Sequence, residues 1–123
     1  MSKASPTQRT LALLKKQGAI AQVVERWNSH ARVRHDLFGI IDVLAIRDGR
    51  YVGIQACAGA SFSARDAKIR ASEHYAAILE AGGLELWAWR QVWGHDARGA
   101  RRRLWKPKIK IYGSEDQQRK ASE

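Results

Sequence analysis

The alternation of apolar and polar positions along the chain predicts two helices. Residues 6–16 form the first, because Pro6 suits the first helical turn and Gly18 suits the end of a helix. The second begins near Ser63, since Ser63 and Asp66 have the spacing of a capping box, and it runs to a pair of glycines. We expect its core face to contain the residues that recur at helical spacing: Ala64, Ala67, Ala71, Tyr75 and Ile78.

Apolar runs separated by turn-forming residues predict five strands, at 19–27, 40–46, 51–57, 84–92 and 104–112. The order α-β-β-β-α-β-β indicates an α/β fold, with a mixed central sheet flanked by helices. Pro107 lacks the N–H that a sheet ladder requires, so the last strand should lie at an edge. We expect one domain over residues 1–113, an exposed connection at 28–39, and disorder in residues 1–5 and 114–123.

One carboxylate, Asp42, interrupts the second apolar run, where burial without a partner is costly. The Asp-Gly pair at 48–49 predicts a two-residue hairpin turn between the second and third strands. That register places Asp42 directly opposite Gln55, with Cβ atoms roughly 5 Å apart. Cys57 lies two residues further along the same strand and points to the same face. The sequence thus predicts a cluster of Asp42, Gln55 and Cys57.

An acid in an apolar strand, a short hairpin and then an acid-x-lysine on the next strand is the signature of the PD-(D/E)XK nuclease superfamily. This chain resembles that superfamily, in particular its small stand-alone resolvase-like and phage-type members, over roughly residues 7–92. Asp42 matches the first motif, and Gln55-Ala56-Cys57 matches the second. The resemblance implies a restriction-endonuclease-like core in which Asp42 and Gln55 hold Mg²⁺ or Mn²⁺. It also implies that Gln8 takes the place of a glutamate found in the first helix.

The motif departs from the superfamily pattern at two positions. Gln55 is neutral, although its carbonyl oxygen is still a candidate metal ligand, and Cys57 replaces the lysine with a thiol that has no positive charge at neutral pH. Because Mg²⁺ is usually held by carboxylates, further acids are needed, and Glu25 and Asp36 are the candidates. The candidates for the missing cation are Lys68 and Arg65, which gives a predicted catalytic set of Asp42, Gln55, Cys57 and Lys68.

The chain is strongly basic, with 22 Lys and Arg against 12 Asp and Glu and a formal net charge of +10. The positive electrostatic field of such a charge attracts polyanions, and we expect nucleic acid, foremost DNA, as the partner. No segment has the pattern of a basic amphipathic helix, which argues against a membrane surface. The predicted nucleic-acid-binding residues are Arg32, Arg34, Arg65, Arg101, Arg102, Arg103, Trp105, Lys106 and Lys108.

Three functions are open on these grounds. The first is a divalent-metal-dependent DNA endonuclease. The second is a catalytically inactive nuclease-fold protein that only binds DNA, or that serves as an accessory or structural protein. The third is a module whose basic face meets an acidic protein. A homodimer is a further expectation, because nucleases of this kind often dimerise to cut two strands.

Several other classes are excluded or disfavoured. The first ten residues lack the apolar stretch of a secretory signal and the single cysteine cannot form an internal disulfide, so we expect a cytoplasmic protein. One cysteine and four scattered histidines do not have the spacing of zinc ligands. The loop Gly59-Ala60-Ser61 lacks the lysine and the glycine spacing of a phosphate-binding P-loop.

Overall fold

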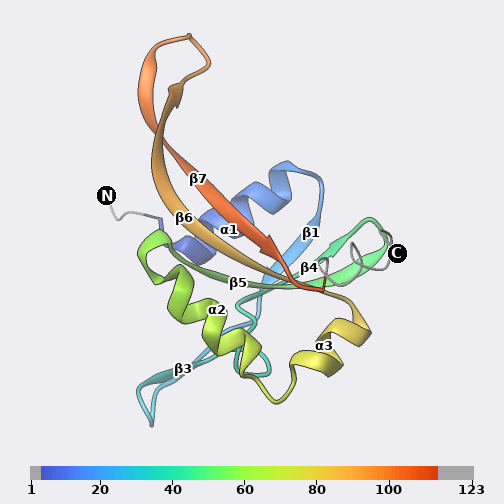
Figure 1. Cartoon of the computed structure of the whole chain (residues 1–123). Helices are drawn as coiled ribbons and strands as arrows, with labels where there is room; N and C mark the ends of the chain where they lie inside the picture. Colours follow the sequence, from blue (N-terminus) through green and yellow to red (C-terminus); the bar gives the residue numbers. More distant parts are fainter. Residues whose placement is uncertain (1–3, 114–123) are drawn as a thin grey trace.

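The computed structural model describes residues 4–113 (Figure 1). Within them the helices are α1 (Pro6–Lys16), α2 (Phe62–Arg70) and α3 (Tyr75–Ala81), with a 3₁₀ turn, η1 (Gly59–Ser61), before α2. The strands are β1 (Ile20–Val23), β2 (Arg26–Asn28), β3 (Val33–His35), β4 (Val43–Arg47), β5 (Arg50–Ala58), β6 (Gly83–His95) and β7 (Arg101–Ile111). The predicted segments at 1–3 and 114–123 lie outside the described residues.

Five strands form one mixed sheet in the order β1-β4-β5-β6-β7, in which β5 and β6 run parallel and the other neighbours antiparallel. β2 and β3 form a separate antiparallel hairpin. The predicted α/β fold with a mixed sheet flanked by helices is therefore confirmed, and the arrangement is compatible with a restriction-endonuclease-like core. β7 lies at the edge of the sheet, as the position of Pro107 predicted.

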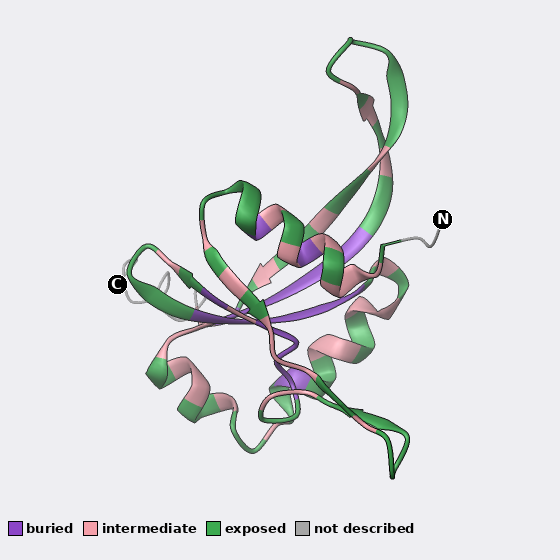
Figure 2. Cartoon of the chain, turned by 180° about the vertical axis from the view of Figure 1, so that it is seen from behind, coloured by how far each residue is buried: buried purple, intermediate pink, exposed green. Residues whose placement is uncertain are grey.

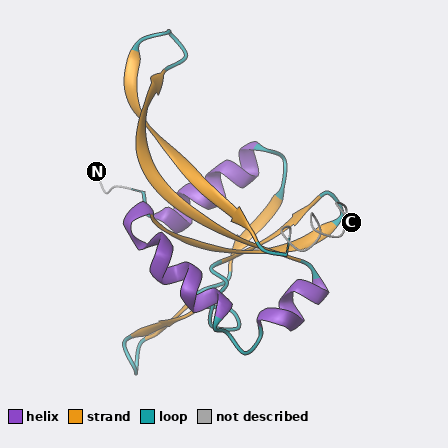
Figure 3. Ribbon diagram, in the orientation of Figure 1, coloured by secondary structure: helices purple, strands orange, loops and turns teal. Residues whose placement is uncertain are grey.

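The sheet separates two apolar layers, with α1 on one face and α2 and α3 on the other (Figures 2 and 3). Successive side chains of a strand point to opposite faces, so β6 supplies both layers. Leu84 and Leu86 pack toward α2 and α3, whereas Trp87 and Trp89 pack toward α1, and the predicted placement of the two pairs on opposite faces is confirmed. The centre of the sheet is consequently buried on both sides (Figure 2).

The β4–β5 hairpin has the predicted register. Its turn residues, Asp48 and Gly49, both have positive φ angles (54° and 76°), which a two-residue turn of type I′ requires. The Asp42 N–H, just before β4, donates a hydrogen bond to the Ile54 carbonyl (2.9 Å). The position of Asp42 directly across from Gln55 therefore follows from the turn. These two residues are the first pair of the candidate site.

The prediction of one long second helix is wrong. The structure has two helices, α2 and α3, because the chain turns where the Ser72 hydroxyl accepts a hydrogen bond from the His74 N–H (3.1 Å). The predicted capping box is wrong too, since the N-cap is Ser61. Asp66 instead accepts a hydrogen bond from the Tyr112 hydroxyl (2.7 Å), which ties α2 to the end of β7.

The predicted core face of this helical region is only partly right. Tyr75 and Ile78 pack against the apolar layer, as expected. In α2, however, the fully buried residue is Ile69, because a large branched side chain removes more apolar surface from water than an alanine does. The predicted core residues that are exposed instead are Ala64, Ala67 and Ala71.

Two predicted strands are shorter in the structure. β1 ends at Val23 rather than at residue 27, and β4 starts at Val43 rather than at residue 40. Ile40 and Ile41 are buried in a turn and not in the sheet, and an apolar run alone does not distinguish these two environments. The predicted exposed connection at 28–39 contains β3, and the β2–β3 hairpin projects from the body of the molecule (Figure 1).

Buried polar groups link α1 to the sheet. The Thr10 hydroxyl donates to the Pro6 carbonyl and accepts from Trp89 Nε1, both at 2.9 Å. We predict that Thr10→Val, which keeps the shape but removes the acceptor, lowers the free energy of unfolding by about 1–3 kcal/mol in urea denaturation. The same change at the partly exposed Thr7 should cost clearly less. Equal costs at the two positions would contradict the role of this hydrogen bond.

β6 and β7 continue well past the rest of the sheet (Figure 1). The last residue pair between β5 and β6 is Ala58 with Trp89. Beyond that point β6 and β7 pair only with each other. We call residues 90–106 the arm.

Among residues 4–113, no helix combines the length and apolar character that crossing a membrane requires.

Candidate functional site

A pocket of about 350 Å³ lies where the end of β5 meets the N-terminal parts of α1 and α2. The arm and the β2–β3 hairpin project above and below this side of the molecule (Figure 1). Segments far apart in sequence supply its polar and charged lining, which includes Ser5, Thr7, Glu25, Arg34, Asp36, Asp42, Gln55, Ser61, Arg65 and Lys68.

Asp42 is held rigidly at the base of this pocket. Its backbone carbonyl accepts a hydrogen bond from the Val24 N–H (2.8 Å), which joins it to the chain leaving β1. Its Oδ2 accepts hydrogen bonds from Gln55 Nε2 (2.7 Å) and from the Ala56 N–H (2.8 Å). Asp42 as a whole is 3% exposed, and these hydrogen bonds set the position and orientation of its carboxylate.

Three carboxylates converge at this point. One oxygen each from Glu25, Asp36 and Asp42 lies within 4.8 Å of the others. Glu25 arrives there because the Val24–Asp42 hydrogen bond sets the two segments side by side. Asp36 arrives through the turn that follows it, in which the Leu37 N–H donates to the Ile41 carbonyl (2.9 Å).

That turn depends on an unusual backbone conformation. Phe38 and Gly39 both have positive φ angles, 53° and 78°. Such angles are uncommon for a residue with a side chain as large as phenylalanine, and they reverse the chain within four residues. As a result two acids six positions apart in sequence, Asp36 and Asp42, face the same pocket.

Cations offset only part of the negative charge. Arg34 Nη1 lies 3.6 Å from Glu25 Oε1, and Lys68 Nζ lies 3.7 Å from Asp36 Oδ2. The pKa of Asp42 is raised to about 7, first by burial and then by a hydrogen bond with the Asp36 carboxyl, while the donations from Ala56 and Gln55 lower it. The Asp42 carboxyl is therefore partly protonated near neutral pH.

Gln55 presents an unsatisfied acceptor beside the acids. Its side chain is 1% exposed, and its Nε2 is used in the bond to Asp42. Its Oε1 is buried and has no hydrogen-bond partner among the described residues. Buried polar atoms without a partner are rare and costly, so this oxygen indicates a ligand that the protein atoms do not supply.

The donor set fits a hard divalent cation. Three carboxylates and an amide oxygen are the oxygen ligands that Mg²⁺ and Mn²⁺ prefer, and the cluster lacks the imidazoles and thiolates typical of zinc. The residues that would hold such an ion are Glu25, Asp36, Asp42 and Gln55.

Cys57 and Lys68 both line the pocket, and they come from different elements, β5 and α2. Cys57 is 5% exposed and packs in the apolar layer beneath α2. Burial raises the pKa of its thiol, although the charge of Arg65 lowers it, so Cys57 has the surroundings of a small apolar side chain and not of a nucleophile. Lys68 reaches the cluster from α2 instead of from β5.

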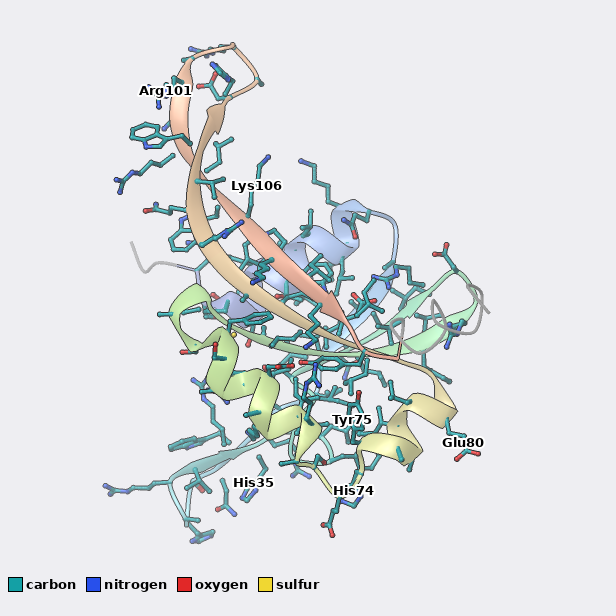
Figure 4. All side chains as sticks on the ribbon, in the orientation of Figure 1. His35, His74, Tyr75, Glu80, Arg101 and Lys106 are labelled. Carbon is teal, nitrogen blue, oxygen red and sulfur yellow. The ribbon has the colours of Figure 1, made fainter. Side chains whose placement is uncertain are left out.

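The predicted nucleic-acid-binding residues fall into three places. Arg34 and Arg65 line the pocket, and Arg32 is exposed between β2 and β3. Arg101, Arg102, Arg103, Trp105 and Lys106 belong to the arm, and Figure 4 shows Arg101 near its tip and Lys106 closer to the sheet. Lys108 lies below the arm, where its Nζ is 4.2 Å from the centre of the Phe62 ring.

The N-terminal segment differs from the sequence prediction. Ser5, which was expected to be disordered, caps α1: its hydroxyl accepts from the Gln8 N–H, and its own N–H donates to Gln8 Oε1, both at 3.1 Å. Gln8 is therefore engaged in a capping box and does not take the place of a catalytic glutamate in the pocket. The Ser-x-x-Gln spacing is visible in the sequence and would have identified this cap.

In comparisons with models of protein families, with curated proteins and with solved structures, the chain has no match.

Proposed function

We propose that this chain is a divalent-metal-dependent nuclease of the PD-(D/E)XK type, which hydrolyses phosphodiester bonds in DNA. One observation carries the proposal: the carboxylates of Glu25, Asp36 and Asp42 converge within 4.8 Å beside the unsatisfied Gln55 Oε1. Arg34 and Lys68 pair with two of these acids, whereas the buried Asp42 has only hydrogen bonds, and a divalent cation would stabilise all three carboxylates together.

When bound there, Mg²⁺ or Mn²⁺ supplies Lewis-acid polarisation of a phosphate oxygen and lowers the pKa of a coordinated water. The contribution of the chain is to fix the ligands in advance. Asp42 is held by two hydrogen bonds and Gln55 by its bond to Asp42. Preorganised groups of this kind do not have to reorganise during the reaction.

The cations around the pocket suit a phosphodiester substrate. Arg34, Arg65 and Lys68 all line it, so a phosphate that enters the pocket meets positive side chains, two of which lie beside the acids. Lys68, beside Asp36, is placed to supply the ammonium that other nucleases of this type carry at the position of Cys57. In this proposal Lys68 positions the attacking water or stabilises the charge that develops on the phosphate.

The two departures in the motif are the reason to consider an inactive protein that only binds DNA as the alternative. The missing carboxylate at Gln55 is compensated by two further acids, Glu25 and Asp36, and the missing lysine at Cys57 by Lys68. These compensations favour an active enzyme over the alternative.

The test is cleavage of labelled double-stranded, nicked and branched DNA with Mg²⁺ or Mn²⁺. We expect the wild type to produce metal-dependent products and Asp42→Asn, which preserves side-chain shape, to lose at least 10²-fold in rate. Asp48→Asn is the matched control, because it makes the same change at an exposed acid of the β4–β5 turn. If the wild type binds DNA but yields no products with either ion, the catalytic proposal fails.

A further inference from the structure

The outer part of the arm projects away from the rest of residues 4–113 (Figures 1 and 3), and nearer the sheet the Arg9 guanidinium of α1 lies 4.0 Å from the centre of the Trp105 ring. Its strands pair from the Trp89–Pro107 level to the His95–Arg101 level, six residues further out. At 3.3 Å per residue this is a projection of about 20 Å. Most of it is exposed (Figure 2), so burial of apolar surface does not explain why the chain extends there.

The charge of the arm is almost entirely positive. Six cations, at Arg90, Arg98, Arg101, Arg102, Arg103 and Lys106, stand against one acid, Asp96. Asp96 has a structural role, since its Oδ1 accepts from the N–H groups of Arg98 (2.9 Å) and Ala100 (3.0 Å) and so shapes the turn at the tip. The arm is thus a cationic ribbon with an ordered end.

Side-chain packing stiffens this ribbon. An isolated two-stranded hairpin is only marginally stable in water, so the arm needs internal contacts. On one face the Trp93 ring, 59% exposed, lies under the guanidinium groups of Arg101 (4.7 Å) and Arg103 (5.3 Å). On the other face Leu104 lies across Gly94, where a Cβ would stand 2.7 Å from Leu104 Cδ1. The cations are therefore presented on a preorganised frame.

We propose that the arm lies in the major groove of duplex DNA beside the scissile phosphate. A two-stranded ribbon fits the major groove of B-form DNA, whereas the major groove of an A-form RNA duplex is too deep and narrow for it. The base of the arm adjoins the pocket, because Ala58, which lines the pocket, pairs with Trp89 directly below the arm. This inference rests on the proposed function and narrows its substrate class to B-form duplex DNA.

The test measures binding without cleavage. All proteins carry Asp42→Asn and bind a fluorescent DNA duplex, or an RNA duplex of the same sequence, in the absence of divalent metal. The arm variant is R101Q/R102Q/R103Q. Its matched control, K15Q/K16Q/R50Q, removes the same charge at the end of α1 and in the β4–β5 hairpin, away from the arm (Figure 1). A second variant, R98Q/K106Q, leaves both cations that stack on Trp93 in place.

We expect the background protein to bind the DNA duplex about tenfold or more tightly than the RNA duplex. The arm variant should bind DNA at least about tenfold more weakly than the control, with R98Q/K106Q intermediate. For the arm variant, the magnitude of the slope of log association constant against log salt concentration should fall by roughly 2–3, since each lost phosphate contact accounts for about 0.9. Equal binding by the arm variant and the control, or equal binding of RNA and DNA, would overturn the inference. Displacement by netropsin, which occupies the minor groove, would overturn the placement in the major groove.

The two proposals fail in different ways. If the wild type cuts DNA and the arm variant binds and cuts like the control, the inference about the arm is wrong and the proposal of nuclease activity is supported. If DNA binding depends on the arm but the wild type never cuts DNA, the proposal of nuclease activity is wrong and the arm is a DNA-binding element. Thermal unfolding of each variant shows whether the core is intact, because the arm lies outside both apolar layers.

Discussion

Replacing Lys68 by methionine should lower the rate of metal-dependent DNA cleavage roughly 10²–10³-fold, the usual cost of removing one preorganised charge or donor from an active site. Lys68 is the cation beside Asp36, at 3.7 Å, and the position where a lysine is expected holds Cys57. Its side chain is about half exposed, so its removal should leave the fold intact. The measurement is the single-turnover rate with Mg²⁺ at saturating enzyme.

Two further variants separate a catalytic role from a structural one. Lys68→Arg retains the positive charge and should recover part of the rate, whereas Lys15→Met, the same change at an exposed residue of α1, should leave it unchanged. The stabilisation of the Lys68→Met protein by Mn²⁺ should persist, because the carboxylates are still present. If Lys68→Met cuts DNA at the wild-type rate, the ammonium of Lys68 does not replace the missing motif lysine.

The metal-free protein should lose stability as pH rises from 5 to 8. The pKa of Asp42 is raised from 3.8 to about 7, so the folded state binds a proton that the unfolded state releases. Such a group stabilises the fold at low pH, and this contribution disappears as pH rises through the folded pKa. For these values the loss is roughly 2–3 kcal/mol between pH 5 and pH 8, or about 10 °C in Tm for a chain of this size.

Asp42→Asn should remove this dependence, because the amide is neutral at every pH. At pH 8 without metal the variant should therefore be more stable than the wild type. Mn²⁺ should restore the stability of the wild type at pH 8, by roughly 2.7 kcal/mol at a hundredfold excess over its Kd, and should have no such effect on the variant. Calorimetric Tm values with EDTA and with Mn²⁺ measure both effects, and Asp48→Asn is the control. A flat wild-type profile would show that Asp42 does not hold a proton in the folded protein.

The sequence by itself determined the central part of the fold and the first pair of site residues. The Asp-Gly turn allows one hairpin register, and that register alone sets Asp42 against Gln55. Strict alternation along β6 assigned Leu84 and Trp87 to opposite layers. Pro107 placed the last strand at an edge. These predictions succeeded because turn geometry and the two-residue period of a strand are local properties.

Other features depended on contacts between distant segments, which local sequence does not specify. The long second helix was predicted from alanine spacing, but Ile69 filled the core and Ser72 turned the chain. The residues before β4 and after β1 were predicted to continue these strands. Instead, Ile40 and Ile41 lie in the turn before β4, and Arg26 and Trp27 belong to the separate β2–β3 hairpin.

The candidate site shows the same division most clearly. Glu25, Asp36 and Lys68 were recognisable in the sequence as suitable residue types, yet nothing local placed them near Asp42. Their convergence required the chain to leave the sheet after β1, the Phe38–Gly39 reversal and the packing of α2 over β5. The sequence determined which residues were available for the chemistry, and only the tertiary structure decided which of them share one pocket, because long-range packing and not local propensity sets the distances between charged groups.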